Sequence, residues 1–282
     1  MTWEETIIYI RTLPEYQNLI HDAYLDEDLL KNVNRFKNSE EYKATLSFIK
    51  QFSPQATKLL DIGAGNGISS IAFALDKFNV TAVEPDSSIT VGSNAIRYVS
   101  DYYTLVNIQV IESYAEKLPF PDATFDIVYA RQAMHHAQNL DLFVSEAFRV
   151  LKKGGIFFTV RDHVIHNNKE KIDFLASHPL QKFYGGENAF SITQYKNAFE
   201  KCGFEILITL SHFDSVINFA PKTEQEILAT DTNLKDTFNK KFPFMSKFLF
   251  PLYKFYISAR YGKINDESNM PGRLYSFIAQ KN

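Results

Sequence analysis

Short blocks of apolar residues recur through the middle of the chain, and their spacing predicts strands that alternate with helices. The predicted strands are residues 58–62, 80–83, 106–111, 125–129, 155–160, 204–210 and 273–279. The predicted helices between them are residues 69–77, 89–99, 140–151 and 192–201. This alternation indicates βαβ units with right-handed connections and a parallel sheet covered on both faces. We therefore predict an α/β fold with a doubly wound, mostly parallel seven-stranded sheet.

The first 52 residues have a helical pattern instead. Thr2 and Glu5 have the spacing of a capping box, and apolar residues follow at helical intervals until Pro14 interrupts them. A second helix is predicted from about Ser39 to Gln51, with its apolar residues on one face. Residues 1–52 are therefore expected to form a helical cap rather than part of the sheet.

The pattern divides the chain into four parts. Residues 1–52 form the N-terminal helical cap, 53–212 the α/β domain, 213–270 a helical insertion that adds to the cap, and 271–282 the last strand, which returns to the sheet. Within the insertion, Phe242–Tyr261 is the most apolar window. A core or cap helix, the wall of an apolar ligand pocket and a membrane-surface contact all remain open for this window.

Composition excludes several classes of protein. Apolar residues make up 45% of the 282 residues and charged residues 22%, which excludes wholesale disorder. The balance of 30 basic and 33 acidic residues argues against a large nucleic-acid interface. No apolar run approaches about 18 residues, and the first residues lack the features of a secretory signal. Cys202 is the one cysteine, so no intramolecular disulfide or cysteine-based zinc cluster forms, and a cytoplasmic location is expected.

A glycine-rich turn after the first predicted strand carries the main chemical signal. Glycines stand at positions 63, 65 and 67, where a strand, a turn and a helix would form a nucleotide cradle. A dinucleotide fingerprint starting at Gly63 needs its third glycine at position 68, which is Ile68. Asp61 ends the strand, and its carboxylate would repel a pyrophosphate. The same carboxylate suits a ligand with an ammonium and a sulfonium group and no phosphate, as in S-adenosylmethionine.

Glu84 directly follows the second predicted strand, 21 positions after Gly63. A carboxylate at about this spacing accepts hydrogen bonds from both hydroxyls of a ribose. Because a nicotinamide dinucleotide needs the same group, Glu84 supports a nucleoside site without choosing between the two cofactors.

These residues belong to a longer series of matching blocks. The blocks are residues 61–67, 84–86, 115–120, 125–128 and 151–155. In order and spacing they resemble the class I S-adenosylmethionine-dependent methyltransferases, in the branch that includes quinone-biosynthesis C-methyltransferases and many small-molecule enzymes. The resemblance runs from about residue 57 to residue 161, a little over a third of the chain. It is specific for fold and cofactor, but this branch methylates carbon, oxygen and nitrogen.

The resemblance implies roles at the methionine end of the cofactor. Gly63, Ala64 and Gly65 would pass along the methionine portion and the ribose. Asp61 would face the amino group of the cofactor, directly or through water. Arg131, just after the fourth predicted strand, would line the methionine end.

The resemblance also implies how the adenosine would be held. Glu84 would bind the ribose diol, Pro85 or Asp86 would flank the adenine, and Ala115 and Glu116 would lie near its edge. One position departs from the family pattern: many relatives have an acidic residue just before the Ala-Glu pair, and Tyr114 stands there instead. The adenine amine would then be bound elsewhere, or Tyr114 would stack on the base.

Methyl transfer from a sulfonium is a direct displacement, so the protein mainly aligns the acceptor, excludes water and, for some acceptors, supplies a base. His135 and His136 follow the fourth predicted strand, and Asp162 and His163 follow the fifth. Open α/β sheets bind ligands at these strand ends. Asp162 and His163 are therefore expected to face the acceptor, with His163 as the best candidate base. A structural role for each histidine stays open, and no spacing typical of metal ligands is present.

A connection with unusual turn residues follows the fifth strand. It contains His178-Pro179 and the run 184–188, Tyr-Gly-Gly-Glu-Asn, which would form either a loop at the acceptor or a simple glycine turn. The sequence as a whole predicts a methyltransferase that uses S-adenosyl-L-methionine and a small-molecule acceptor. A non-catalytic binding or accessory protein on the same fold is the alternative. A dinucleotide oxidoreductase is disfavoured by Asp61 and Ile68.

Overall fold

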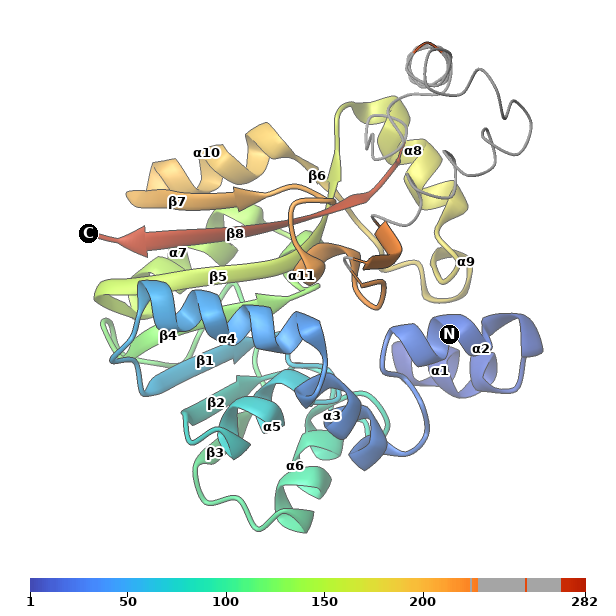
Figure 1. The fold of residues 1–282 in the computed structure, drawn as a ribbon, viewed down its shortest axis with the longest axis horizontal. Coiled ribbons are helices and arrows are strands. Elements are labelled where there is room, and N and C mark those ends of the chain that lie inside the picture. Colours follow the sequence, from blue (N-terminus) through green and yellow to red (C-terminus); the bar gives the residue numbers. More distant parts are fainter. Residues whose placement is uncertain (224, 228–251, 253–269) are drawn as a thin grey trace.

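The computed structural model describes residues 1–223, 225–227, 252 and 270–282. Its centre is a sheet in the order β3-β2-β1-β4-β5-β8-β7, with the short β6 paired to β5 (Figure 1). The strands are β1 (Lys58–Ile62), β2 (Asn79–Val83), β3 (Ile108–Ile111), β4 (Phe125–Arg131), β5 (Leu151–Ile165), β6 (Phe190–Ser191), β7 (Phe204–Leu210) and β8 (Arg273–Lys281). Only β8 runs antiparallel to its neighbours β5 and β7, so the predicted mostly parallel α/β sheet is confirmed.

The helices surround this sheet, and in the described residues they enclose two large apolar cores and two smaller apolar clusters. They are α1 (Trp3–Arg11), α2 (Gln17–Asp22), α3 (Leu29–Lys37), α4 (Glu40–Phe52), α5 (Ile68–Leu75), α6 (Ser93–Tyr102), α7 (Leu140–Val150), α8 (Asn168–Ser177), α9 (Gln181–Tyr184), α10 (Ile192–Cys202) and α11 (Val216–Phe219), with two 3-10 turns at Pro14–Tyr16 and Met134–His136. Side chains alternate between the faces of a strand. In β1, Leu59 therefore packs in the core shared with α3, α4 and α5, and Leu60 in the core shared with α7 and α10.

Local sequence signals place several of these boundaries. The capping box of Thr2 and Glu5 is present at the start of α1, and Ser39 caps α4 through a hydrogen bond to the N–H of Tyr42. Some predicted boundaries are wrong: α6 begins at Ser93 rather than at residue 89. Asp86 accepts a hydrogen bond from the N–H of Ser88, and this turn keeps the residues that follow it out of the helix. Strand β5 runs from Leu151 to Ile165 rather than from 155 to 160, so Asp162 and His163 lie within it rather than after it.

The N-terminal helices divide into two groups. Helices α3 and α4 pack against the sheet domain, whereas α1 and α2 lie beside α9 at the end of the sheet where β1, β4 and β5 terminate (Figure 1). The N-terminal ammonium group donates a hydrogen bond to the carbonyl of Phe183, 3.2 Å away. Helices α1 and α2 therefore cover the carboxyl ends of the strands.

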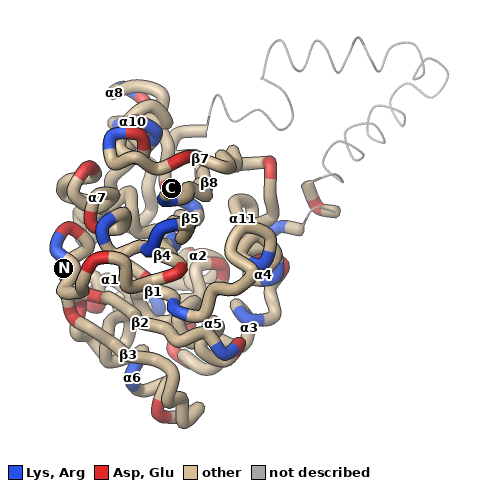
Figure 2. The backbone as a smooth tube through the Cα atoms, turned by 90° about the vertical axis from the view of Figure 1, so that its left-hand side faces the viewer, with Lys and Arg blue, Asp and Glu red and all other residues tan. Residues whose placement is uncertain are grey.

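Most of the insertion predicted at 213–270, including the window Phe242–Tyr261, lies outside the described residues. Its first part forms α11, which packs against α4 and β8. Basic and acidic residues are interspersed over the described chain (Figure 2). Within that part of the chain, no helix combines the length and the apolar character needed to cross a bilayer.

Candidate active site

A cavity of about 500 Å³ opens at the carboxyl ends of β1, β2, β4 and β5. The turn after β1 lines it at one end, and the wall that carries His135, His136, His163 and His178 is called the far wall below. Trp3 of α1 and Leu19 of α2 line it as well. All the predicted cofactor-binding residues except Asp61 line it: Gly63, Ala64, Gly65, Glu84, Pro85, Asp86, Ala115, Glu116 and Arg131. Of the predicted catalytic residues, His135 and His163 line it and Asp162 does not.

The glycine turn brings backbone close to the cavity. Gly63 has a φ of +67°, and a Cβ on it would lie 2.6 Å from the Cβ of Ala133, so only glycine fits there. Its N–H and that of Ala64 donate to the carbonyl of Val83, at 2.9 and 3.1 Å, which ties the turn to the end of β2. A larger residue at position 63 would therefore clash with Ala133 unless the turn moved.

Glu84 is held beside this turn by two backbone donors. Its Oε2 accepts from the N–H of Gly65 at 2.7 Å, and its Oε1 accepts from the N–H of Asp86 at 2.9 Å. Each carboxylate oxygen keeps a further lone pair, and the residue lines the cavity. Burial raises the pKa of Glu84 to about 7. The arrangement is a fixed double acceptor, which suits two neighbouring hydroxyl groups.

The predicted adenine-binding residues lie along one side of the cavity. The Oε1 atom of Glu116 accepts a hydrogen bond from the N–H of Gln138 at 2.9 Å, and this bond fixes the loop before α7. Tyr114, the residue that departs from the family pattern, lines the same side, and its side chain is mostly exposed. It is therefore placed at the cavity mouth rather than in its interior.

Asp61 corrects one expectation from the sequence. It is buried and does not line the cavity, because alternation along β1 turns its side chain toward α5, where Oδ2 accepts from the hydroxyl of Ser70 at 2.6 Å. This carboxylate therefore does not face the cavity, so a direct contact with a ligand there is not expected. Burial raises the pKa of Asp61 to about 7, and its Oδ1 is buried without a hydrogen-bond partner.

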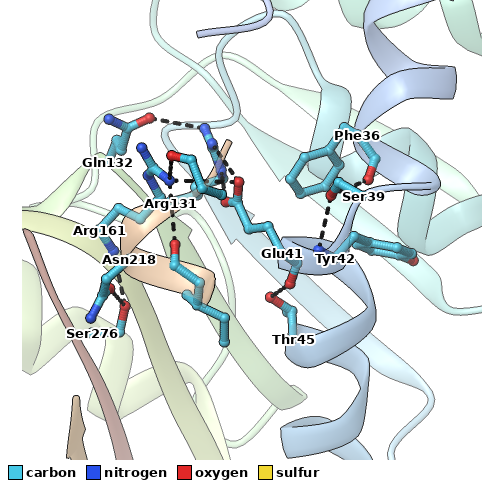
Figure 3. A network of polar contacts seen from close by, with 12 residues as sticks. Phe36, Ser39, Glu41, Tyr42, Thr45, Arg131, Gln132, Arg161, Asn218 and Ser276 are labelled. Atoms are coloured by element: carbon cyan, nitrogen blue, oxygen red, sulfur yellow. Dashed lines mark hydrogen bonds and ion pairs between the residues drawn. The ribbon is translucent and has the colours of Figure 1, made fainter. Parts of the chain in front are cut away.

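Arg131 lines the cavity and also forms a buried ion pair that no sequence motif predicts. Its Nε donates to Oε1 of Glu41 at 2.6 Å, and its Nη2 to Oε2 at 3.2 Å (Figure 3). Arg161 approaches the same carboxylate, with Nη1 3.8 Å from Oε2. Glu41 is 1% exposed, so α4 supplies one buried acid for two buried guanidinium groups.

His135 and Asp162 form a buried pair at the far wall. The Oδ1 of Asp162 lies 3.0 Å from the Nδ1 of His135 and accepts from the N–H of the same residue at 3.0 Å. The expectation that Asp162 faces the acceptor is wrong, because a bulge in β5 at Val160 and Arg161, where φ is +62°, redirects the side chains that follow. Asp162 instead orients His135, and burial raises its pKa to about 8.

His163 is fixed in a similar way. Its Nδ1 lies 2.6 Å from the carbonyl oxygen of Gly272, which makes Nδ1 the donor and leaves Nε2 with a lone pair. Burial lowers the pKa of His163 to about 3, so the imidazole is neutral at pH 7. The rings of His163 and His135 meet edge to face, with centroids 4.7 Å apart.

The connection after α8 also reaches this wall, so its residues form part of the cavity rather than a remote turn. The Oε1 atom of Glu187 lies 3.5 Å from the Nδ1 of His178, and its Oε2 atom lies 3.9 Å from the Nε2 of His135. The hydroxyl of Tyr184 donates to Glu187. The sequence marked this connection by its Gly185-Gly186 pair, but not the carboxylate that follows.

Comparison with known proteins gives the class of this domain. Residues 60–159 match the family model described as a methyltransferase domain. A segment of 101 residues is 36% identical to 27-O-demethylrifamycin SV methyltransferase of Amycolatopsis mediterranei, covering 35% of this chain and 36% of that protein. The chain thus spans little more than a third of that relative.

Solved structures share the fold at low identity. Geranyl diphosphate C-methyltransferase from Streptomyces coelicolor superposes with a TM-score of 0.56 at 15% identity, covering 85% of this chain and 79% of that one. The protein titled [4+2]-cyclase SpnF superposes with a TM-score of 0.53 at 18% identity, covering 85% and 80%. Identities this low support the fold alone.

Residues 60–159 therefore form a methyltransferase domain of the class I, S-adenosylmethionine-dependent kind. The cofactor of this class is S-adenosyl-L-methionine, and the residues present fit it. Glu84 offers a double acceptor to a ribose diol, Gly63, Ala64 and Gly65 line the cavity beside it, and a buried oxygen of Asp61 lies unpartnered behind the turn.

Proposed function

We propose that the chain transfers the methyl group of S-adenosyl-L-methionine to a small polar acceptor bound at the histidine-lined wall. One observation carries this proposal: a single cavity joins the glycine turn and Glu84 at one end to His135 and His163 at the other. A methyl donor bound at the first end would present its sulfonium toward the second.

The cofactor supplies an activated methyl group when bound, and the chain would hold it by groups already in place. Glu84 would accept hydrogen bonds from the ribose hydroxyls, and Pro85 and Asp86 would flank the adenine. The guanidinium of Arg131, which lines the cavity, would face the carboxylate of the methionine part. Helices α1 and α2 would exclude water once the cofactor is bound.

The acceptor end supports a polar substrate. Neutral His163 keeps a lone pair on Nε2, and Asp162 fixes the ring of His135. We propose His163 as the group that contacts the acceptor, with its neutral Nε2 accepting a hydrogen bond from it, and Asp162 as a positioning residue for His135. The relatives named above act on oxygen and carbon according to their names, or catalyse a cyclisation, so they do not fix the acceptor of this chain. The proposal keeps the cytoplasmic location expected from the sequence.

The test is methyl transfer from tritiated S-adenosyl-L-methionine to a panel of small hydroxy acids, sugars, phenols and amines. The proposal expects incorporation into at least one class, and a loss of at least about 10-fold in kcat/KM for Glu84→Gln, equal to about 1.4 kcal/mol. Binding of the cofactor without transfer to any acceptor would favour the alternative, a non-catalytic binding protein on the same fold. Absence of cofactor binding would contradict both.

A further inference from the structure

The acceptor wall brings together three groups that share the chemistry of a metal site. The side chains of His135, His163 and Glu187 each offer one ligand atom, and these atoms all lie within 4.8 Å of one another. They come from three separate elements: the 3-10 turn after β4, the end of β5, and the loop after α9. Their sequence positions show no metal-binding pattern, so only the fold assembles them.

The two histidines are already oriented as metal ligands usually are. A metal-binding histidine nearly always gives its second ring nitrogen to a carboxylate or a carbonyl oxygen, which fixes the tautomer. The Nδ1 of His135 lies 3.0 Å from Oδ1 of Asp162, and the Nδ1 of His163 lies 2.6 Å from the carbonyl oxygen of Gly272. Both rings therefore keep Nε2 for a ligand, and both are set by groups within the fold.

The third ligand is placed to complete the set. Oε2 of Glu187 lies 3.9 Å from Nε2 of His135, and the Glu187 side chain is 6% exposed. Bonds of about 2.1 Å to a common metal ion would bring neighbouring ligand atoms to about 3.0–3.4 Å apart. Ligand atoms up to 4.8 Å apart would have to approach each other by at most about 1.4–1.8 Å. Glu187 follows Gly185 and Gly186, whose backbone adjusts readily.

We propose that His135, His163 and Glu187 bind one divalent first-row transition metal ion, such as Zn²⁺, at the acceptor end of the cavity. Two imidazoles and one carboxylate suit such ions better than Mg²⁺, which prefers oxygen ligands. Three protein ligands leave coordination positions open toward the cavity. The metal's role rests on the proposed function: the open positions bind an oxygen atom of the acceptor and orient it toward the methyl donor. A metal-bound Nε2 has no lone pair left, so His163 then acts as a ligand and not as a base.

The first experiment measures metal binding without cofactor or acceptor. The chain is stripped with a chelator, and Co²⁺ is titrated while its visible absorption is recorded, followed by displacement with Zn²⁺. The inference expects one ion per chain, with affinity lowered at least about 100-fold in Glu187→Gln and in His163→Ala. His21→Ala is the control, because this exposed histidine lies outside the cavity, and it should bind Co²⁺ as the unaltered chain does.

A second measurement uses the unaltered chain, so its result does not depend on whether the variants fold. In the proton NMR spectrum of the Co²⁺ form, two exchangeable, strongly shifted signals are expected from the Nδ1–H groups of two histidine ligands. No stoichiometric binding, or binding that the Glu187 and His163 changes leave intact, would overturn the inference. Methyl transfer that persists in chelator with no metal bound would overturn the metal's role and leave the proposed function standing. A chain that binds Co²⁺ here but no S-adenosylhomocysteine would contradict the proposed function instead.

Discussion

Replacing Glu41 by glutamine tests how the buried arginines are held. Glu41 is 1% exposed and pairs with Arg131 at 2.6 Å, while Arg161 lies 3.8 Å from its second oxygen (Figure 3). Glutamine keeps the shape of the side chain but removes the charge. Two buried guanidinium groups then face each other without a counter-charge, because within the described part of the chain no other carboxylate is paired with either of them.

The magnitude follows from the burial of the pair. Breaking a buried ion pair by removing one partner costs about 3–5 kcal/mol in the free energy of unfolding. At about 2 °C per kcal/mol for a chain of this size, the Tm should fall by about 6–10 °C. The neighbouring change Glu40→Gln is the matched control, because Glu40 pairs with Lys43 at 2.7 Å while both side chains are about 60% exposed. Its cost should stay below about 1 kcal/mol.

The assay is urea unfolding followed by circular dichroism, with Tm from calorimetry. A double variant, Glu41→Gln with Arg131→Gln, should recover part of the loss, because one uncompensated charge has been removed with its partner. Since Arg131 lines the cavity, Glu41→Gln should also weaken binding of S-adenosylhomocysteine. Equal losses for Glu41→Gln and Glu40→Gln would show that the buried pair contributes no more to stability than the exposed one, contrary to this prediction.

Two further predictions concern the cofactor end of the cavity. Because burial raises the pKa of Glu84 from 4.5 to about 7, its contribution to stability should be largest below about pH 4.5 and should fall by about 3 kcal/mol as the pH rises to about 7. Asp61 adds a change of the same sign. The affinity for S-adenosylhomocysteine should change in the opposite direction and fall as the pH drops below 7. Calorimetric titrations between about pH 5.5 and 8, a range that spans the pKa of Glu84, would measure this affinity. An affinity that does not vary with pH would contradict the role of Glu84. Gly63→Ala should weaken cofactor binding at least about 10-fold. Gly154 has a similar φ of +77° with open space around it, so Gly154→Ala should lower stability without changing cofactor affinity. Equal affinities in the two variants would contradict the role of the turn.

The sequence predicts the fold well where the signals are local. Alternating and helical periods place β1 and β7 at their observed bounds, and the capping box places the start of α1. The helix predicted at residue 89 begins later, because a turn at Asp86 holds the intervening backbone. The period of apolar residues does not show such a turn, because the turn depends on the side chain of Asp86 and not on which residues are apolar.

The candidate site is predicted less completely, because its parts meet only in three dimensions. Glu41 and Arg131 are 90 positions apart, and nothing in either segment indicates the pair. Asp162 is predicted at the right strand end, but a bulge in β5 turns it behind His135. Glu187 lines the cavity from a loop. The glycines of this loop predict a turn, but they do not predict where the turn lies relative to the cavity.

A structure of the complex with S-adenosylhomocysteine would show whether the cavity binds the cofactor as proposed. Both ribose hydroxyls should lie within hydrogen-bond distance of the Glu84 carboxylate, with the sulfur atom directed toward His135 and His163. A nucleotide with its diphosphate against Gly63 and Gly65, or a cavity that S-adenosylhomocysteine does not enter at saturating concentration, would contradict this proposal.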